Sequence, residues 1–136
     1  MIDSKLYAWI FLTTGEKQTS LSDVLWSADA INRAVPELEE LQMSLGWLQA
    51  QGLVKKEGKN YLYSGTGAMM YKSNSGGNIF DVWDEIAQKF TQFPEIDFQL
   101  EEITEKEIVN AEKVNKKRFK ELIQKLNEEK NTNMSL

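Results

Sequence analysis

Two groups of basic residues have the types and spacing that could do chemistry, and that chemistry is phosphate binding. Lys55, Lys56 and Lys59 surround Gly58 in a short polar segment. A lysine ammonium neutralises phosphate as a point charge, so the group could clamp a nucleic-acid backbone. Lysines also keep exposed strand edges soluble and discourage aggregation. The sequence leaves both interpretations open for this group.

The second basic group lies near the C-terminus. It consists of Lys113, Lys116, Lys117, Arg118, Lys120 and Lys125. Residues 1–112 carry 18 acidic and 9 basic side chains, whereas residues 113–136 carry 3 acidic and 7 basic ones. The cluster spans most of a helix circumference, as a solvated helix would, and lysines near a helix C-terminus are favoured by its dipole. This helix can pair with the acidic body, with a second subunit or with DNA.

Catalytic chemistry has no credible set of residues in this sequence. The chain has no His and no Cys, which excludes thiolate metal sites, disulfides and the commonest general base. Asp81, Asp84 and Glu85 are grouped, but they begin a predicted helix, where carboxylates serve the cap and the dipole. "GTG" and "SGG" lack the context of a phosphate loop. We therefore expect no enzyme, no metal site and no cofactor.

Composition indicates one compact domain with a helical tail. The 136 residues are 41% apolar, which suffices for a core. The net charge of −5 and the pI of about 4.9 disfavour non-specific adhesion to nucleic acids or anionic membranes. The apolar run near the N-terminus is too short for a membrane span and lacks the flanks of a signal peptide. We expect a soluble, cytoplasmic protein with no membrane partner.

Two helices must come first along the chain. Asp3 or Ser4 can cap the first helix, whose bulky residues cover most of its circumference, and Gly15 can end it. Ser20 can cap the second helix, in which apolar residues recur at helical spacing as far as Val35. We expect the first of these helices to be largely buried.

A third helix is predicted from Pro36 to Gln51. Proline pushes the residue before it toward extended geometry and suits the first turn of a helix, so Val35 and Pro36 form a turn. Gly52 ends the helix, and one apolar stripe runs along it. The stripe consists of Leu38, Leu41, Leu45 and Leu48. Two helices joined in this way are typical of a helix-turn-helix.

A β-hairpin should follow, because Leu53 and Val54 open a strand, "EGKN" makes a turn and "YLYS" returns. "GTG" then ends the hairpin flexibly, and "SNSGG" is the most linker-like stretch. Further helices are predicted over 79–90 and from Thr104, which forms a capping box with Glu107, to about residue 129. The fold class is therefore mainly α with a small β-hairpin wing, α+β: a winged helix-turn-helix in residues 1–66 followed by two C-terminal helices in residues 67–136.

The phrase "LGWLQAQGLVKKEGKNYLYSGTG" resembles the end of the recognition helix and the wing of bacterial regulators of the MarR and PadR groups. The resemblance covers about residues 4–66. It implies that the third helix enters the major groove and that the wing, residues 55–61, contacts the DNA backbone or minor groove. It also implies dimerising helices in residues 67–136. Winged helices serve as protein-interaction modules as well, so fold alone does not decide function.

The leading functional hypothesis is a DNA-binding transcriptional regulator. A homodimer would bind two half-sites of double-stranded DNA, with Gln42 and Ser44 near base edges and Lys55, Lys56 and Lys59 on phosphates.

The alternative is a winged helix that binds a protein partner or itself and does not contact DNA directly. On a helical wheel Glu40, Met43 and Trp47 lie opposite the leucine stripe, so the face that should meet DNA is acidic and apolar. An exposed Trp beside an exposed Met would suggest a protein interface. Trp47 could instead be covered by the C-terminal region. A third hypothesis is a regulator that binds a small molecule between its two halves.

Overall fold

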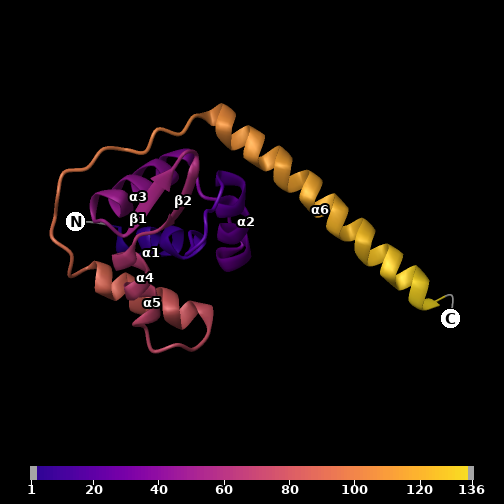
Figure 1. Cartoon of the computed structure of the whole chain (residues 1–136), viewed down its shortest axis with the longest axis horizontal. Coiled ribbons are helices and arrows are strands. Elements are labelled where there is room, and N and C mark those ends of the chain that lie inside the picture. Colours follow the sequence, from indigo (N-terminus) through magenta and orange to yellow (C-terminus); the bar gives the residue numbers. More distant parts are fainter. Residues whose placement is uncertain (1–2, 135–136) are drawn as a thin grey trace.

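The computed structural model describes residues 3–134 and contains six helices and one pair of strands in that range (Figure 1). This confirms the predicted fold class, mainly α with a small β-hairpin. The elements in chain order are α1 (Ser4–Thr13), α2 (Leu21–Asn32), α3 (Leu38–Ala50), β1 (Val54–Glu57), β2 (Asn60–Tyr63), α4 (Gly65–Lys72), α5 (Ile79–Phe90) and α6 (Glu105–Met134).

The hairpin forms the wing of the fold. Strands β1 and β2 pair antiparallel, from Val54 opposite Tyr63 to Glu57 opposite Asn60, and Gly58 turns the chain with φ +60°. The loop between α1 and α2 joins the sheet edge through backbone hydrogen bonds between Thr19 and Tyr61, each 2.8 Å long. Three helices followed by this hairpin are the winged helix-turn-helix arrangement that the sequence predicts.

Local signals explain where α2 and α3 begin. The Ser20 hydroxyl accepts the backbone N–H of Asp23 at 3.2 Å and caps α2. Helix α3 begins at Leu38, two residues after Pro36, and the Glu37 backbone N–H donates to Glu40 Oε1 at 2.9 Å. Glu40 therefore satisfies a backbone N–H at the start of its own helix.

Helix α4 was not predicted, so three helices rather than two follow the hairpin. The Ser64 hydroxyl accepts the Gly67 N–H at 3.0 Å and caps this helix. A Cβ on Gly67 would lie 1.9 Å from the carbonyl oxygen of Leu53. Glycine at this position permits close packing of α4 on the start of the hairpin, whereas the sequence prediction took "GTG" as a flexible end.

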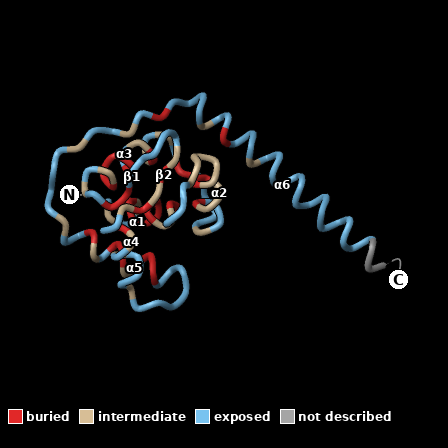
Figure 2. The backbone as a smooth tube through the Cα atoms, in the orientation of Figure 1, coloured by how far each residue is buried: buried red, intermediate tan, exposed pale blue. Residues whose placement is uncertain are grey.

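The core is built around α1, which packs against α2, α3 and α5 (Figure 2). Tyr7 of α1 stacks on Trp47 of α3 with ring centroids 4.9 Å apart, and Phe11 of α1 meets Phe90 of α5 at 5.5 Å. The indole N–H of Trp83 in α5 donates to the carbonyl of Lys5 at 2.8 Å. Residues on both sides of the predicted boundary at 66 therefore share one core.

Helix α6 is the one part of the described chain that leaves this body. An extended segment passes around α3 and joins α5 to α6, which then projects away from the other elements (Figure 1). Only the first half of α6 has buried or half-buried side chains, and residues 116–131 are all exposed (Figure 2). The molecule thus has a closed body and a long free helix.

Candidate functional site

The side of α3 that carries Gln42, Gly46 and Gln49 is covered by the chain itself. Residues 94–104, which we call the strap, run along it in extended conformation. The Glu101 backbone N–H donates to the Gln42 carbonyl at 3.0 Å, and the Gln42 side-chain amide donates to the Ile103 carbonyl at 2.9 Å. An extended segment has backbone groups that need partners, and α3 supplies them. The strap therefore occupies part of the surface that a recognition helix would turn toward DNA, while Met43 stays exposed.

Gly46 allows the strap to approach the α3 backbone. A Cβ at this position would lie 2.2 Å from the carbonyl oxygen of Gln99, so every other residue type would push the strap away. Glycine inside a helix costs roughly 0.5–1 kcal/mol relative to alanine. Sequence reasoning missed this residue, although a glycine in the middle of a regular helical pattern is a signal of close packing or function.

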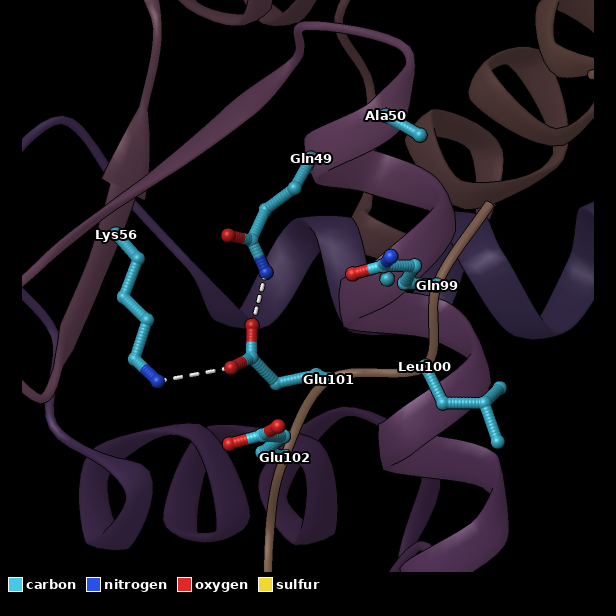
Figure 3. Close-up of a pocket in the computed structure, with 8 residues that line it drawn as sticks. Gln49, Ala50, Lys56, Gln99, Leu100, Glu101 and Glu102 are labelled. Atoms are coloured by element: carbon cyan, nitrogen blue, oxygen red, sulfur yellow. Dashed lines mark hydrogen bonds and ion pairs between the residues drawn. The ribbon is translucent and has the colours of Figure 1, made fainter. Parts of the chain in front are cut away.

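Glu101 holds the middle of the strap against both α3 and the wing. Its side chain is 8% exposed and accepts from Lys56 Nζ at 2.8 Å and from the side-chain amide of Gln49 (Figure 3). These residues line one side of a pocket of about 460 Å³ between α3, the wing and the strap. The ion pair neutralises Lys56, which is therefore not free for phosphate.

Tyr61 lies beneath this ion pair. Lys56 Nζ is 5.7 Å from the centroid of the Tyr61 ring. Burial raises the pKa of the Tyr61 phenol well above its ordinary value, and the negative charges of Glu101 and Glu107 raise this pKa further. Tyr61 is therefore a neutral, packed side chain that supports the strap from below.

The five predicted DNA contacts are not brought together on one open surface. Ser44 is 0% exposed, so the prediction that it lies near base edges is wrong, and its hydroxyl has no hydrogen-bond partner among the described residues. Gln42 is occupied by the strap and Lys56 by its ion pair. Lys55 and Lys59 are exposed on the wing. Lys55 also pairs with Glu57 at 3.4 Å, so of the five residues only Lys59 is exposed and without an ion pair among the described residues.

The alternative set of interface residues is also divided. Trp47 is fully buried, with Tyr7 4.9 Å and Phe90 5.0 Å from its ring, so the prediction that it faces outward is wrong. The other interpretation, that the C-terminal region covers Trp47, is confirmed by Phe90 of α5. Met43 is exposed, whereas Glu40 is half-buried and bonded to the start of its own helix. These residues do not form one exposed patch.

The grouped carboxylates have local partners. Asp81 lies in the first turn of α5, Asp84 forms an ion pair with Lys5, and Glu85 accepts the backbone N–H of Ser75. This hydrogen bond lowers the pKa of Glu85. Among the described residues, no group of three or more His, Cys, Asp or Glu side chains could hold a metal ion. The carboxylates therefore serve the fold.

The basic cluster anchors α6 at one point and is otherwise exposed. Arg118 pairs with Asp23 of α2 at 3.1 Å, and its guanidinium lies 4.3 Å from the ring centroid of Trp26. One turn earlier, the Asn115 amide donates to the Ser22 carbonyl at 2.9 Å. These contacts hold α6 on α2 and fix the direction in which it leaves.

Beyond this anchor, α6 presents an apolar stripe with no partner in the described chain. The stripe consists of Phe119, Leu122, Ile123 and Leu126, which are 43–59% exposed. Where the stripe begins, Phe119 also lines a mostly apolar groove of about 390 Å³ between α2 and α6. Leu25, Trp26 and Val35 line the other side of this groove. Sequence analysis identified this part of the chain as a possible dimerisation region.

Comparison of the chain with protein-family models, with curated proteins and with solved structures finds no match in any of the three. The resemblance to the MarR and PadR groups therefore stays a prediction. Within residues 3–134, no helix combines the length and the apolar character that a membrane crossing requires. Two surfaces bear on function: the side of α3 under the strap and the apolar stripe of α6.

Proposed function

We propose that this protein is a winged-helix association module, which acts by binding protein and does not read DNA with α3. The observation that carries the proposal is the strap that lies along α3. Base readout requires side chains that reach into the major groove. Here Gln42 is bonded to the strap and Ser44 is buried, while the strap backbone lies against Gly46. The space that a duplex would need is filled by protein.

The charge on this surface supports the same proposal. Glu39 and Glu40 lie in the first turn of α3, and the strap adds Glu101 and Glu102. A DNA-binding surface gains most of its affinity from cations that replace the counterions of phosphates. Lys56, the wing cation that contacts the strap, is already paired with Glu101.

A second candidate function is contact with duplex DNA that is independent of base sequence. It is favoured by the exposure of Lys55 and Lys59 on the wing and of Lys116, Lys117 and Lys120 on α6. Such contacts would use phosphates alone and would leave α3 covered. A regulator of the kind that the resemblance implies would require the strap to move.

One titration separates these functions. A fluorescent pool of random-sequence duplexes is titrated with the full chain at low salt, and anisotropy is measured. The association module gives no change in anisotropy. Binding that falls steeply with salt and weakens in a Lys55→Ala/Lys59→Ala variant would establish the second candidate. Selection of one sequence from the pool, lost in a Gln42→Ala variant, would overturn the proposal that α3 does not read DNA.

A further inference from the structure

The free half of α6 is a surface that the body leaves uncovered. The face that places Asn115 on α2 continues along the helix through Phe119, Leu122 and Leu126, at steps of four, three and four residues. Phe119 is 57% exposed and Leu126 is 59% exposed. The side of α6 that packs on the body is therefore apolar for about two further turns beyond the last body contact.

The groove between α2 and α6 continues into this stripe. Phe119 lines the groove together with Trp26 and Val35, and it also lines a second shallow hollow that extends along α6 past Ile123. An apolar helix laid beside α6 would cover the stripe and fill the groove in one contact. Helical peptides and helices of partner subunits are bound in this way in many proteins.

Charge along α6 selects the direction of such a helix. Residues 113–120 carry five basic and no acidic side chains, whereas residues 125–132 carry two of each. A second α6 in the parallel direction would bring the two sets of five cations together, and like charges across an interface are unfavourable. In the antiparallel direction each basic segment faces a segment of zero net charge, and Lys116 lies opposite Glu129.

We propose that the occupant is α6 of a second copy of this chain, in antiparallel orientation, centred between Leu122 and Ile123. This proposal rests on the proposed association function and names its partner. Leu126 of the second copy then lies beside Phe119, at the mouth of the groove lined by Trp26. Because the arrangement has two-fold symmetry, both grooves are filled by the same contact.

The rim of the groove fits the end of the incoming helix. Asp29 of α2 and Glu112 of α6 lie at this rim, and the antiparallel orientation brings Lys130 of the second copy close to them. The apolar residues meet in the middle and opposite charges meet at the ends. Each α6 thus presents both the apolar stripe and the charges that the other α6 contacts, so the surface is self-complementary.

Molar mass in solution tests the proposal directly. Sedimentation equilibrium of the full chain over a range of micromolar concentrations should give twice the chain mass of 15.6 kDa. A Leu122→Glu/Leu126→Glu variant should give the mass of one chain, with an unchanged far-ultraviolet circular dichroism spectrum because both side chains are exposed and the helices stay folded. Val114→Glu is the matched control, since Val114 is equally exposed but lies on another face of α6, and it should keep the double mass.

Introduced cysteines test the orientation, because the natural chain has none. A chain with both Lys116→Cys and Glu129→Cys should form disulfide-linked dimers under mild oxidation. Glu129→Cys alone should not, because the two Glu129 positions are far apart in the antiparallel orientation.

Two outcomes overturn the proposal. Efficient cross-linking of Glu129→Cys alone would show a parallel pair. A single-chain mass for the natural protein at all concentrations would leave the stripe to a different protein. Neither outcome depends on the DNA titration, so failure of this inference and failure of the proposed function are distinguishable.

Discussion

Helices α3 and α6 differ in how much of their surface the rest of the molecule covers. Helix α3 has the place in the chain order that a recognition helix would have, yet its leucine stripe, Trp47 and Gly46 are all covered by the chain's own elements. Helix α6 has no recognised motif, yet it carries the open apolar stripe. The difference teaches that a helical pattern predicts which face packs, whereas the freedom of the opposite face depends on elements far away in sequence.

The cause of this difference lies in what each helix offers to an approaching backbone. Helix α3 has Gln42 and Gln49, which bond to the strap, and Gly46, which makes room for it. Helix α6 offers charged side chains and apolar groups in its free half. Such a surface attracts another helix more readily than an extended segment, because it has few groups for unpaired backbone N–H and C=O.

The largest expected effect concerns the buried side of α3. Trp47→Ala should lower the free energy of unfolding by about 3–5 kcal/mol, because it leaves a cavity among Tyr7, Phe90 and Phe93. Trp47→Phe is the matched control. It should cost much less, because the indole N–H of Trp47 is buried and finds no hydrogen-bond partner among residues 3–134, so its removal relieves that cost. Chemical denaturation measures both. A loss below about 1 kcal/mol in the alanine variant would contradict the burial of Trp47.

The strap gives the next largest effect. Gly46→Ala should lower the free energy of unfolding by about 1–3 kcal/mol, because the methyl group collides with the Gln99 carbonyl. Hydrogen exchange of the Glu101 amide, which donates to α3, should become faster in this variant. Gly65→Ala is the control, since nothing lies within 4 Å of a Cβ there, and it should be neutral or slightly stabilising. If the two substitutions lowered the free energy of unfolding equally, the close contact between Gly46 and the strap would not explain the effect.

The link between strap and wing should contribute less. Glu101→Gln loses the ion pair with Lys56 and should lower the free energy of unfolding by about 1–2 kcal/mol. Glu102→Gln removes the same charge from an exposed neighbour and should change stability by less than about 0.5 kcal/mol. If Glu102→Gln proved the more costly change when the two variants are compared by thermal denaturation, the role assigned to Glu101 would be wrong.

The smallest effect is confined to alkaline pH. Burial raises the pKa of Tyr63, whose hydroxyl donates to the Phe11 carbonyl at 2.9 Å. The unfolded chain loses the Tyr63 proton near pH 10, the ordinary pKa, before the folded chain does. The higher pKa of Tyr63 in the folded chain therefore contributes its full stabilisation below pH 10, and this contribution is lost as the pH rises toward the folded pKa. Tyr63→Phe should therefore reduce the fall in stability above pH 10. Denaturation curves on both sides of pH 10 measure this.

Local sequence signals were sufficient to predict the helices and strands of the fold other than α4. Pro36, Gly52 and the hairpin turn at Gly58 each act within a few residues, and the structure places a helix start, a helix end and a turn beside them. Helix α4 was missed because Gly65 and Gly67 look like chain breakers, although close packing on Leu53 explains Gly67. A glycine can mark either a flexible segment or a position where two backbones pack closely, and only the surrounding structure distinguishes the two.

The candidate site could not be predicted in the same way. A helical wheel correctly placed Trp47 opposite the leucine stripe, but Phe90 and the strap, which cover that side, lie more than 40 residues further along the chain. Gln42 and Ile103, which bond to each other, are 61 residues apart in the sequence. The apolar stripe of α6 follows from local helical spacing alone, because no other element of the described chain covers it.

Because α6 is one uninterrupted helix, the number of residues in it also matters. From Glu105 to Met134 the chain has neither Pro nor Gly, and each residue turns the helix by about 100°. One residue inserted between Asn115 and Phe119 would rotate the whole stripe by about 100° relative to the anchor. Seven inserted residues, about two full turns, would restore its direction and move it about 10 Å outward. The number of residues in this stretch, and not only their type, therefore sets the direction in which the stripe faces.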